Sequence, residues 1–83
     1  MWYVYVLESL KDGKWYTGST DDLKRRLKEH QKGHVEATRN RRPLKLLYYE
    51  ACINEKTTIE REKYLKTAWG KRYLRKRIGK RPQ

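Results

Sequence analysis

Four types of side chain that can carry chemistry lie in short, well-defined segments of this sequence. Tyr5 lies in an aromatic run near the start, Tyr16 follows a turn signal, Arg26 and His30 are four residues apart, and Glu62 lies among apolar residues. Phenol and imidazole groups can transfer protons, a guanidinium can neutralise phosphate charge, and a carboxylate can hold a hard cation such as magnesium. These groups can act together only if the elements that carry them bring them to one place.

Two strands joined by a tight turn are expected at the start of the chain. The run Trp2–Leu7 is rich in β-branched and aromatic residues, which favour strands. Both faces of this run are apolar, so we expect a central strand that is covered on both sides. Asp12-Gly13 is a hairpin turn signal, and it predicts that residues 15–19 form the returning strand.

The same turn determines which tyrosines share a face of the sheet. With a two-residue turn at Asp12-Gly13, Ser9 lies opposite Tyr16, and residues that lie opposite one another point to the same face. Because side chains alternate along a strand, Tyr3 and Tyr5 then point to the same face as Tyr16. We therefore expect the three phenols on one side of the hairpin.

A helix that carries the Arg and the His is expected next. Residues 20 and 21 offer an N-cap, and a glycine follows the expected end at about residue 32. At 100° per residue, Leu23 and Leu27 bracket His30, and Arg26 lies about 60° from Leu23. Arg26 is thus expected at the margin of the buried stripe. His30, between two leucines, is either a core histidine or a group that acts in chemistry.

The second half of the chain completes the predicted fold. A polar, basic loop at 34–43 leads to a third strand at 44–50, and a second helix is expected from about residues 54–57 to Trp69, before Gly70. A short basic helix and tail follow. The sequence predicts a single domain over residues 1–83 of the α/β (α+β) class: a small three-stranded antiparallel sheet flanked by helices, in the order β-β-α-β-α with a short basic C-terminal helix.

Glu62 lies in the middle of the apolar arc of the second predicted helix. Ile59, Leu65 and Trp69 form this arc over about 120° of the helical wheel. An unpaired carboxylate would be costly in such surroundings, so the arrangement indicates a partner. A bound ligand is one partner. Lys66 is the other, because a Glu four residues before a Lys forms a favourable helix pair.

The strong positive charge indicates a polyanionic partner. The 83 residues include 22 Lys and Arg and 10 acidic residues, a net charge of +12, and nucleic acid is the first candidate for a field of this sign. An anionic membrane is the rival, but no segment has a basic helix with a broad apolar face or a run long enough to span a bilayer. No signal peptide is recognisable at the start, and the single Cys52 fits a reducing cytosol. We therefore expect a cytoplasmic protein that does not act at membranes.

Two basic segments are the expected contact surfaces for nucleic acid. Seven of the eleven residues from Lys71 to Arg81 are basic and none is acidic, which favours a surface that follows a phosphate backbone. The basic loop offers a second patch. Trp69 and Tyr73 could stack on an unpaired base, although Trp69 is expected in the core. The predicted nucleic-acid contacts are Arg39, Arg41, Arg42, Lys66, Lys71, Arg72, Arg75, Lys76 and Arg77.

The predicted hairpin resembles the signature of the GIY-YIG nuclease family. Tyr3-Val4-Tyr5, then ten residues, then Tyr16-Thr17-Gly18 resemble the two halves of that signature. The resemblance covers nearly the whole chain, and it extends to short stand-alone bacterial members and to the N-terminal domain of excision-repair nuclease subunits. It continues after the hairpin through Gly18-Ser19-Thr20, Asp22-Leu23, Arg26, His30 and Glu62.

This resemblance implies a metal-dependent DNA endonuclease of low sequence selectivity, with a structure-selective role in DNA repair or recombination. It implies that Glu62 holds Mg²⁺ or Mn²⁺, that Tyr5 acts as general base or relay, and that Arg26 neutralises charge developing on the phosphate. Tyr16 would position the water or the phosphate, and His30 would be a second proton-transfer group or a phosphate contact. The implied partner is duplex or branched DNA, with RNA as an alternative, and the oligomeric state stays open.

Two other hypotheses stand beside the nuclease. Many family nucleases carry an Asn after the catalytic Glu, whereas no Asn follows Asn54 here, so Lys66, Lys71 or Arg72 would have to make its phosphate contact. A non-catalytic, basic nucleic-acid-binding module that keeps the nuclease fold is therefore the alternative. A third hypothesis is a basic accessory protein bound to ribosomal RNA or to a protein partner. One Cys and two His without close spacing do not form a zinc site.

Overall fold

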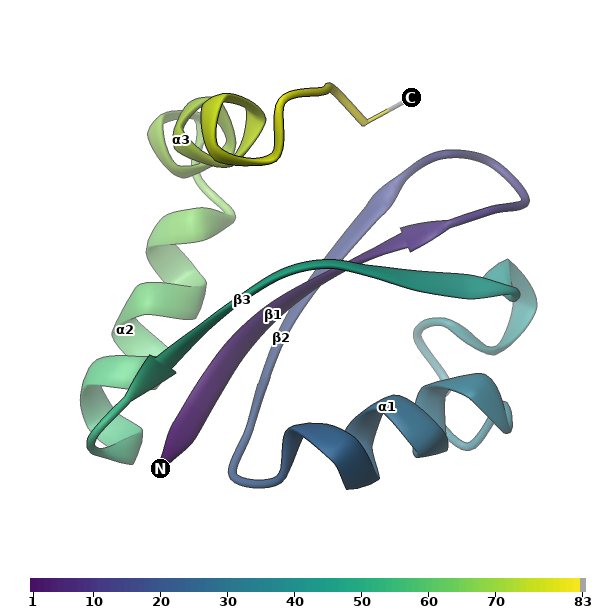
Figure 1. The fold of residues 1–83 in the computed structure, drawn as a ribbon, viewed down its shortest axis with the longest axis horizontal. Coiled ribbons are helices and arrows are strands. Elements are labelled where there is room, and N and C mark those ends of the chain that lie inside the picture. Colours follow the sequence, from purple (N-terminus) through teal and green to yellow (C-terminus); the bar gives the residue numbers. More distant parts are fainter. Residues whose placement is uncertain (83) are drawn as a thin grey trace.

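The computed structural model describes residues 1–82, and it confirms the predicted α+β class and element order. No helix within these residues has the length and apolar character that crossing a membrane requires. Figure 1 shows α2 and α3 on one side of the strands, with the chain turning sharply between them, and α1 on the other side. The elements are β1 (Trp2–Ser9), β2 (Trp15–Thr20), α1 (Leu23–Gln31), a 3-10 turn η1 (Arg39–Arg41), β3 (Leu44–Cys52), α2 (Glu55–Leu65) and α3 (Ala68–Ile78).

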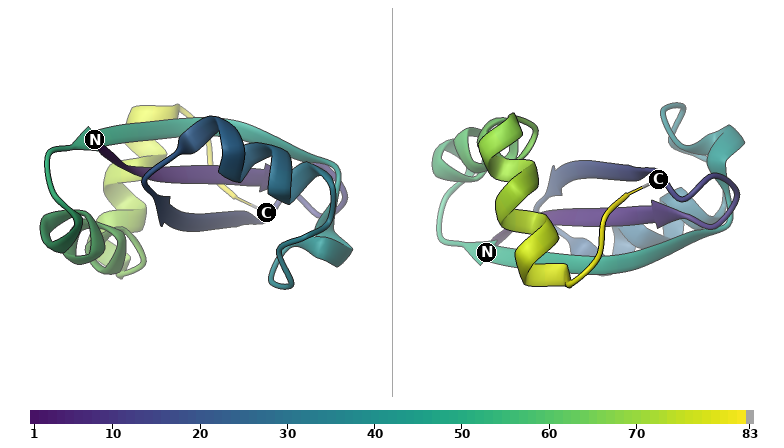
Figure 2. Two further views of the ribbon diagram at one scale, coloured as in Figure 1. Left: turned by 90° about the horizontal axis from the view of Figure 1, so that it is seen from below. Right: turned by 90° about the horizontal axis from the view of Figure 1, so that it is seen from above.

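β1 is the central strand, as its two apolar faces predict. The strand order is β2-β1-β3, and both neighbours run antiparallel to β1. Val4 and Val6 lie on the face covered by α2 and α3, where they pack against Leu65 and Leu74. The opposite face carries a second apolar cluster under α1, and Figure 2 shows α1 and α3 on opposite sides of the sheet. This second cluster contains Tyr5, Leu7, Tyr16, Leu23, Leu27, Leu44 and Leu46.

The β1–β2 turn is longer than predicted, so the predicted pairing of Ser9 with Tyr16 is wrong. The Ser9 N–H donates to the Lys14 carbonyl at 2.9 Å, and Tyr16 lies opposite Leu7. Within this longer turn the Ser9 hydroxyl accepts the N–H groups of Lys11 and Asp12. The shift is two residues, and a shift of two keeps the alternation of faces. The register therefore still places Tyr5 on the same face as Tyr16.

The second predicted helix is in fact two helices. α2 ends at Leu65, and the Thr67 side chain caps α3 by accepting the Gly70 N–H at 3.2 Å. The prediction that the helix stops before Gly70 is wrong. Gly70 lies in the first turn of α3, where a Cβ would collide with the Tyr64 carbonyl. The glycine is needed because the two backbones touch at this corner. The prediction that Trp69 is a core residue is also wrong, because its side chain is 69% exposed on α3.

A polar cluster holds α2 and α3 against β3. Arg61 forms a two-pronged ion pair with Glu50, at 2.8 and 2.9 Å, and the Tyr48 hydroxyl donates to the same carboxylate at 2.6 Å. The Arg61 guanidinium also lies over the Tyr73 ring, 4.9 Å from its centroid. The Arg61 guanidinium holds the pKa of Glu50 below its usual range. Because the charged pair is bidentate, it fixes the position of α2 relative to the sheet.

Substitution of Gly70 by alanine tests the contact at the corner of α2 and α3. We expect Gly70→Ala to lower the free energy of unfolding by about 1–3 kcal/mol, because the added methyl group must displace backbone. Urea unfolding followed by far-UV circular dichroism measures this change. Lys71→Ala, at the exposed neighbouring position, is the control and should change stability by less than about 0.5 kcal/mol. Equal stability of Gly70→Ala and the parent would contradict the packing described here.

Candidate active site

Three of the predicted site residues form one cluster on the α1 face of the sheet. Tyr5 and Tyr16 come from the hairpin, and His30 comes from α1. The His30 ring centroid lies 5.5 Å from that of Tyr5 and 5.3 Å from that of Tyr16. Tyr5 and His30 are fully buried, whereas Tyr16 is partly exposed. We call these three residues the Tyr–His cluster, and Tyr16 is its connection to the surface.

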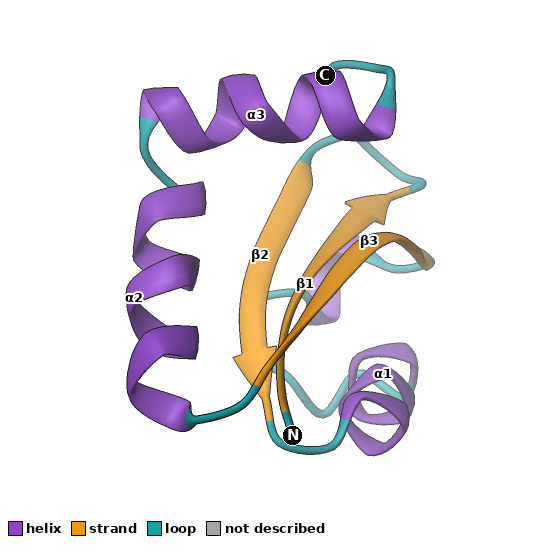
Figure 3. Ribbon diagram, turned by 60° about the vertical axis from the view of Figure 1, so that its left-hand side comes forward, coloured by secondary structure: helices purple, strands orange, loops and turns teal. Residues whose placement is uncertain are grey.

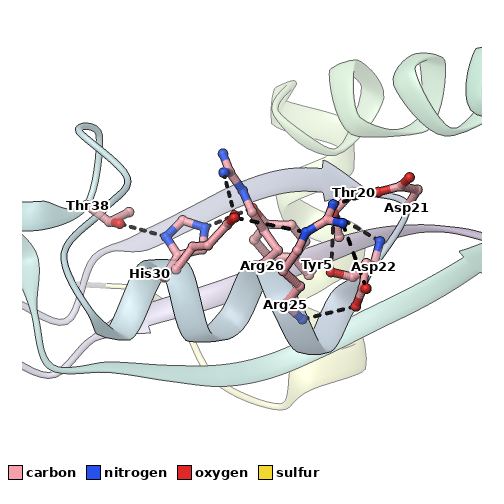
Figure 4. A network of polar contacts seen from close by, with 9 residues as sticks. Tyr5, Thr20, Asp21, Asp22, Arg25, Arg26, His30 and Thr38 are labelled. Carbon is pink, nitrogen blue, oxygen red and sulfur yellow. Dashed lines mark hydrogen bonds and ion pairs between the residues drawn. The ribbon is translucent and has the colours of Figure 1, made fainter.

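A chain of hydrogen bonds runs through this cluster. The Tyr5 hydroxyl lies 2.8 Å from His30 Nε2, and His30 Nδ1 lies 2.7 Å from the Thr38 hydroxyl (Figure 4). In a neutral imidazole one nitrogen donates and the other accepts. When Tyr5 donates to Nε2, the Nδ1–H donates to Thr38, and the opposite tautomer reverses both bonds. Each buried nitrogen of His30 therefore has a hydroxyl partner.

Thr38 is a residue that sequence reasoning missed. It is fully buried, in the loop before η1, and its hydroxyl contacts His30 instead of capping the turn. A loop threonine eight residues after a histidine gives no periodic signal, so no pattern indicated this contact. The Thr38 hydroxyl is the hydrogen-bond partner of His30 Nδ1, so its role is to position the imidazole ring.

Burial keeps both members of the Tyr5–His30 pair neutral at pH 7. Removal from water raises the pKa of Tyr5 to about 12, although the neighbouring Arg26 opposes this rise. Burial also lowers the pKa of His30 to about 4, with a further lowering by the positive charge of Arg26. The phenol therefore carries its proton, and the neutral imidazole can accept that proton at Nε2.

Gly18 allows the Tyr5 ring to lie where it does. The two residues are paired across β1 and β2. A Cβ at position 18 would lie 2.6 Å from the Tyr5 hydroxyl oxygen and 3.1 Å from a ring carbon of Tyr16. The glycine of the Tyr16-Thr17-Gly18 segment is thus required by close packing under the phenol ring.

Arg26 lies beside the cluster, at the margin predicted by the helical wheel. Its side chain is 35% exposed, against 58% for Arg25, and its guanidinium donates to Glu29 at 3.1 Å. The Tyr5 hydroxyl interacts with this guanidinium and raises the pKa of Arg26. A permanent positive charge therefore stands next to the phenol, partly exposed and within reach of an anion from solvent.

Glu62 is on α2, and its partner in the structure is Lys66. The Lys66 ammonium lies 2.7 Å from the Glu62 carboxylate. The apolar surroundings predicted for Glu62 are wrong, because Ile59 and Trp69 are both exposed and only Leu65 of the predicted arc is buried. The helix break after Leu65 explains the position of Trp69, which lies on α3 and not on the helix of Glu62. The charge of Glu62 nevertheless contributes to the raised pKa of Tyr5, so the carboxylate is within electrostatic reach of the cluster.

Glu62 is a single carboxylate, so a magnesium ion at this position would have to be held mainly by water and substrate. Within residues 1–82 no group of three or more His, Cys, Asp or Glu side chains could hold a metal ion by itself. A single carboxylate is sufficient for Mg²⁺, which keeps several waters and takes phosphate oxygens as further ligands. Glu62 meets this requirement, since its side chain is 21% exposed. A metal ion there would have to displace the Lys66 ammonium.

The predicted basic contacts fall into two groups. In the loop, Arg39 donates to the Gly33 carbonyl at 3.2 Å, Arg42 donates to the Arg39 carbonyl at 3.0 Å, and Arg41 lies 3.8 Å from the Asp12 carboxylate. These arginines help to hold the loop together. α3, in contrast, contains no acidic residue, and it presents most of its cations to solvent. Its exposed or partly exposed cations are Lys71, Arg72, Arg75, Lys76 and Arg77.

Comparison with known proteins matches this chain to one family. The GIY-YIG catalytic domain family matches residues 1–78. A UPF0213 protein of Clostridium perfringens is 43% identical over 65 residues, which are 77% of this chain and 69% of that protein. One of Orgyia pseudotsugata multicapsid polyhedrosis virus is 38% identical over 85 residues, covering 100% of this chain and 81% of that protein. The solution NMR structure of a UPF0213 protein from Bacillus halodurans has a TM-score of 0.55 and 38% identity, covering 89% of this chain and 82% of that one.

The lowered pKa of His30 predicts a pH dependence of stability. The unfolded chain takes up a proton on this histidine near pH 6.5, whereas the folded protein does so only near pH 4. Stability from this group is therefore present above pH 6.5 and is lost as the pH falls through 4, by roughly 3 kcal/mol in total. Urea unfolding of the parent and of His30→Gln between pH 7 and pH 4 separates this loss from that of the carboxylates. Parallel curves for the two proteins would show that His30 is not held neutral.

Proposed function

The chain belongs to the GIY-YIG catalytic domain family, and from this premise we propose that it is a metal-dependent endonuclease that hydrolyses phosphodiester bonds in DNA. The observation that carries the proposal is the buried Tyr5–His30 hydrogen bond with Arg26 beside it. A buried phenol linked to a proton acceptor, next to a fixed positive charge, suits attack on a phosphate. We further propose low sequence selectivity, a cytoplasmic location, and a role in DNA repair or recombination.

Each residue of the site has a specific task in this proposal. The Tyr5 oxygen takes a proton from the attacking water and passes its own proton to His30 Nε2, which lies 2.8 Å away. Thr38 keeps the Nδ1 side of the ring hydrogen-bonded during this transfer. Arg26 neutralises the charge that develops on the phosphate, a task for which a permanently charged, planar group is suited. An anionic phosphate beside the cluster would also raise the pKa of His30, which makes the imidazole a better proton acceptor.

Two more residues complete the proposed site. Tyr16, the partly exposed member of the Tyr–His cluster, orients the water or the phosphate by a hydrogen bond. Glu62 would hold Mg²⁺ or Mn²⁺, which supplies Lewis-acid activation when bound. Lys66, released from Glu62 by the metal, would be available for the phosphate backbone.

A non-catalytic nucleic-acid-binding module is the second candidate function. The observation that favours it is the ion pair between Lys66 and Glu62, which gives the carboxylate a protein partner in place of a metal. This candidate predicts salt-sensitive binding of DNA and no cleavage with any divalent metal ion.

A cleavage assay with two matched pairs of variants separates the candidates. With Mg²⁺ or Mn²⁺ and a panel of duplex, single-stranded, flap and junction DNA, we expect the parent to cut and Glu62→Ala to be inactive. Tyr5→Phe should cut at least about 100-fold more slowly, because it loses the group that transfers the proton. Glu60→Ala, exposed on the same helix, and Tyr49→Phe, exposed on β3, are the controls and should cut like the parent. Undiminished cleavage by Glu62→Ala would refute the metal assignment, and binding without cleavage by every protein would support the binding module.

A further inference from the structure

A pocket of about 510 Å³ lies where β2 faces the corner between α2 and α3. Figure 3 shows β2 beside the corner that α2 and α3 form. Leu65 and Leu74, both almost fully buried, and the partly buried Trp15 give the pocket an apolar and aromatic interior. The exposed lysines that line it are Lys14, Lys66 and Lys71.

We propose that this pocket binds one unpaired nucleotide of the DNA strand that is cut. The base lies against the apolar interior, and the lysines bind the phosphate attached to it. This inference rests on the proposed function, because it identifies the form of DNA that the same site accepts.

The chemistry of the lining matches a nucleotide better than other small ligands. Three ammonium groups surround the pocket, and none of its lining residues is acidic. An anion alone needs no apolar interior, and an apolar ligand alone needs no lysines. A nucleotide has both a π-face that stacks on aromatic side chains and a phosphate that binds cations, which is how single strands are generally recognised.

Two residues that line the pocket also contact the candidate active site. Tyr16 lines the pocket and belongs to the Tyr–His cluster, with its ring 5.3 Å from that of His30. Lys66 lines the pocket from the other side and binds the Glu62 carboxylate at 2.7 Å. A nucleotide in the pocket would therefore touch Tyr16 of β2 and Lys66, which link the pocket to the two parts of the proposed site.

The size of the pocket determines which DNA can use it. Its volume of about 510 Å³ is in the range of small-molecule sites, which gives room for a single nucleotide. A base that is stacked and paired inside a duplex cannot reach such a pocket. Fully paired DNA would have to expose a base first, at a cost in unstacking and unpairing. Flaps, single-stranded ends and mismatches already offer such a base, so we infer a preference for these substrates.

Binding of a labelled oligonucleotide without metal tests the pocket independently of cleavage. The probes are a single strand and a blunt duplex of the same sequence, with 2-aminopurine, whose fluorescence falls on stacking, placed at successive positions. In EDTA, we expect Lys71→Glu to bind the single strand about tenfold more weakly than the parent and to lose the fluorescence quenching. Lys45→Glu carries the same change of charge on β3, outside the pocket, and should lower the affinity no more than about twofold. Equal losses for the two variants would overturn the proposal, because they would reflect net charge alone.

A neutral variant distinguishes a filled pocket from a changed charge. Thr17→Trp adds bulk at the pocket wall and leaves every lysine in place. We expect it to lose the quenching and the preference for single strand over duplex, with an unchanged circular dichroism spectrum. Quenching equal to that of the parent would refute the pocket.

The binding and cleavage outcomes can be told apart. Selective loss of single-strand binding in these variants, with no cleavage by the parent, would retain the pocket and reject the nuclease. Cleavage by the parent, with all variants binding the single strand as the parent does, would retain the nuclease and reject the pocket.

Discussion

The hydrogen bond between the Tyr5 phenol and the His30 imidazole is the interaction on which the site depends. Both side chains are fully buried, and a buried polar group without a partner would cost the domain a large part of its stability. The bond requires a fixed position of α1 on the sheet. It also requires Gly18 under the phenol and the Thr38 hydroxyl on the other side of the imidazole. The hairpin, α1 and the loop before η1 are therefore constrained by one pair of atoms.

The sheet separates two environments that a small domain has to combine. One face carries the apolar contacts with α2 and α3, and the other carries the Tyr–His cluster within its own apolar surroundings. A domain of this size has a thin core, so it also relies on the Arg61–Glu50 pair to attach the helices to β3. The edge strand β2 connects the two environments, because Tyr16 contacts the cluster and Lys66 of the helical side lines the same pocket.

The features that followed correctly from the sequence depend on local periodicity. Alternation along a strand kept Tyr5 and Tyr16 on one face even though the turn was longer than predicted, and the helical wheel located Arg26 at a buried margin. The family was indicated by the resemblance of the hairpin and α1 residues to a known signature, and the family match over residues 1–78 confirms it. Contacts between distant segments could not be derived in this way. The collision that Gly70 avoids involves a carbonyl in the preceding helix, and the partners of His30 and Arg61 come from a loop and a strand with no periodic relation to them.

The close approach of Gly18 to the Tyr5 ring shows that a residue of the family signature can be required for packing and not for chemistry. Only glycine fits at this position, because any side chain would displace the phenol. The buried imidazole of His30 would then lose its hydrogen-bond partner. A descendant gene that lost Glu62 would lose the proposed metal ligand and still need the glycine in order to fold. The hairpin glycine therefore reports on the architecture of the domain, whereas the proposed activity depends on the carboxylate on α2.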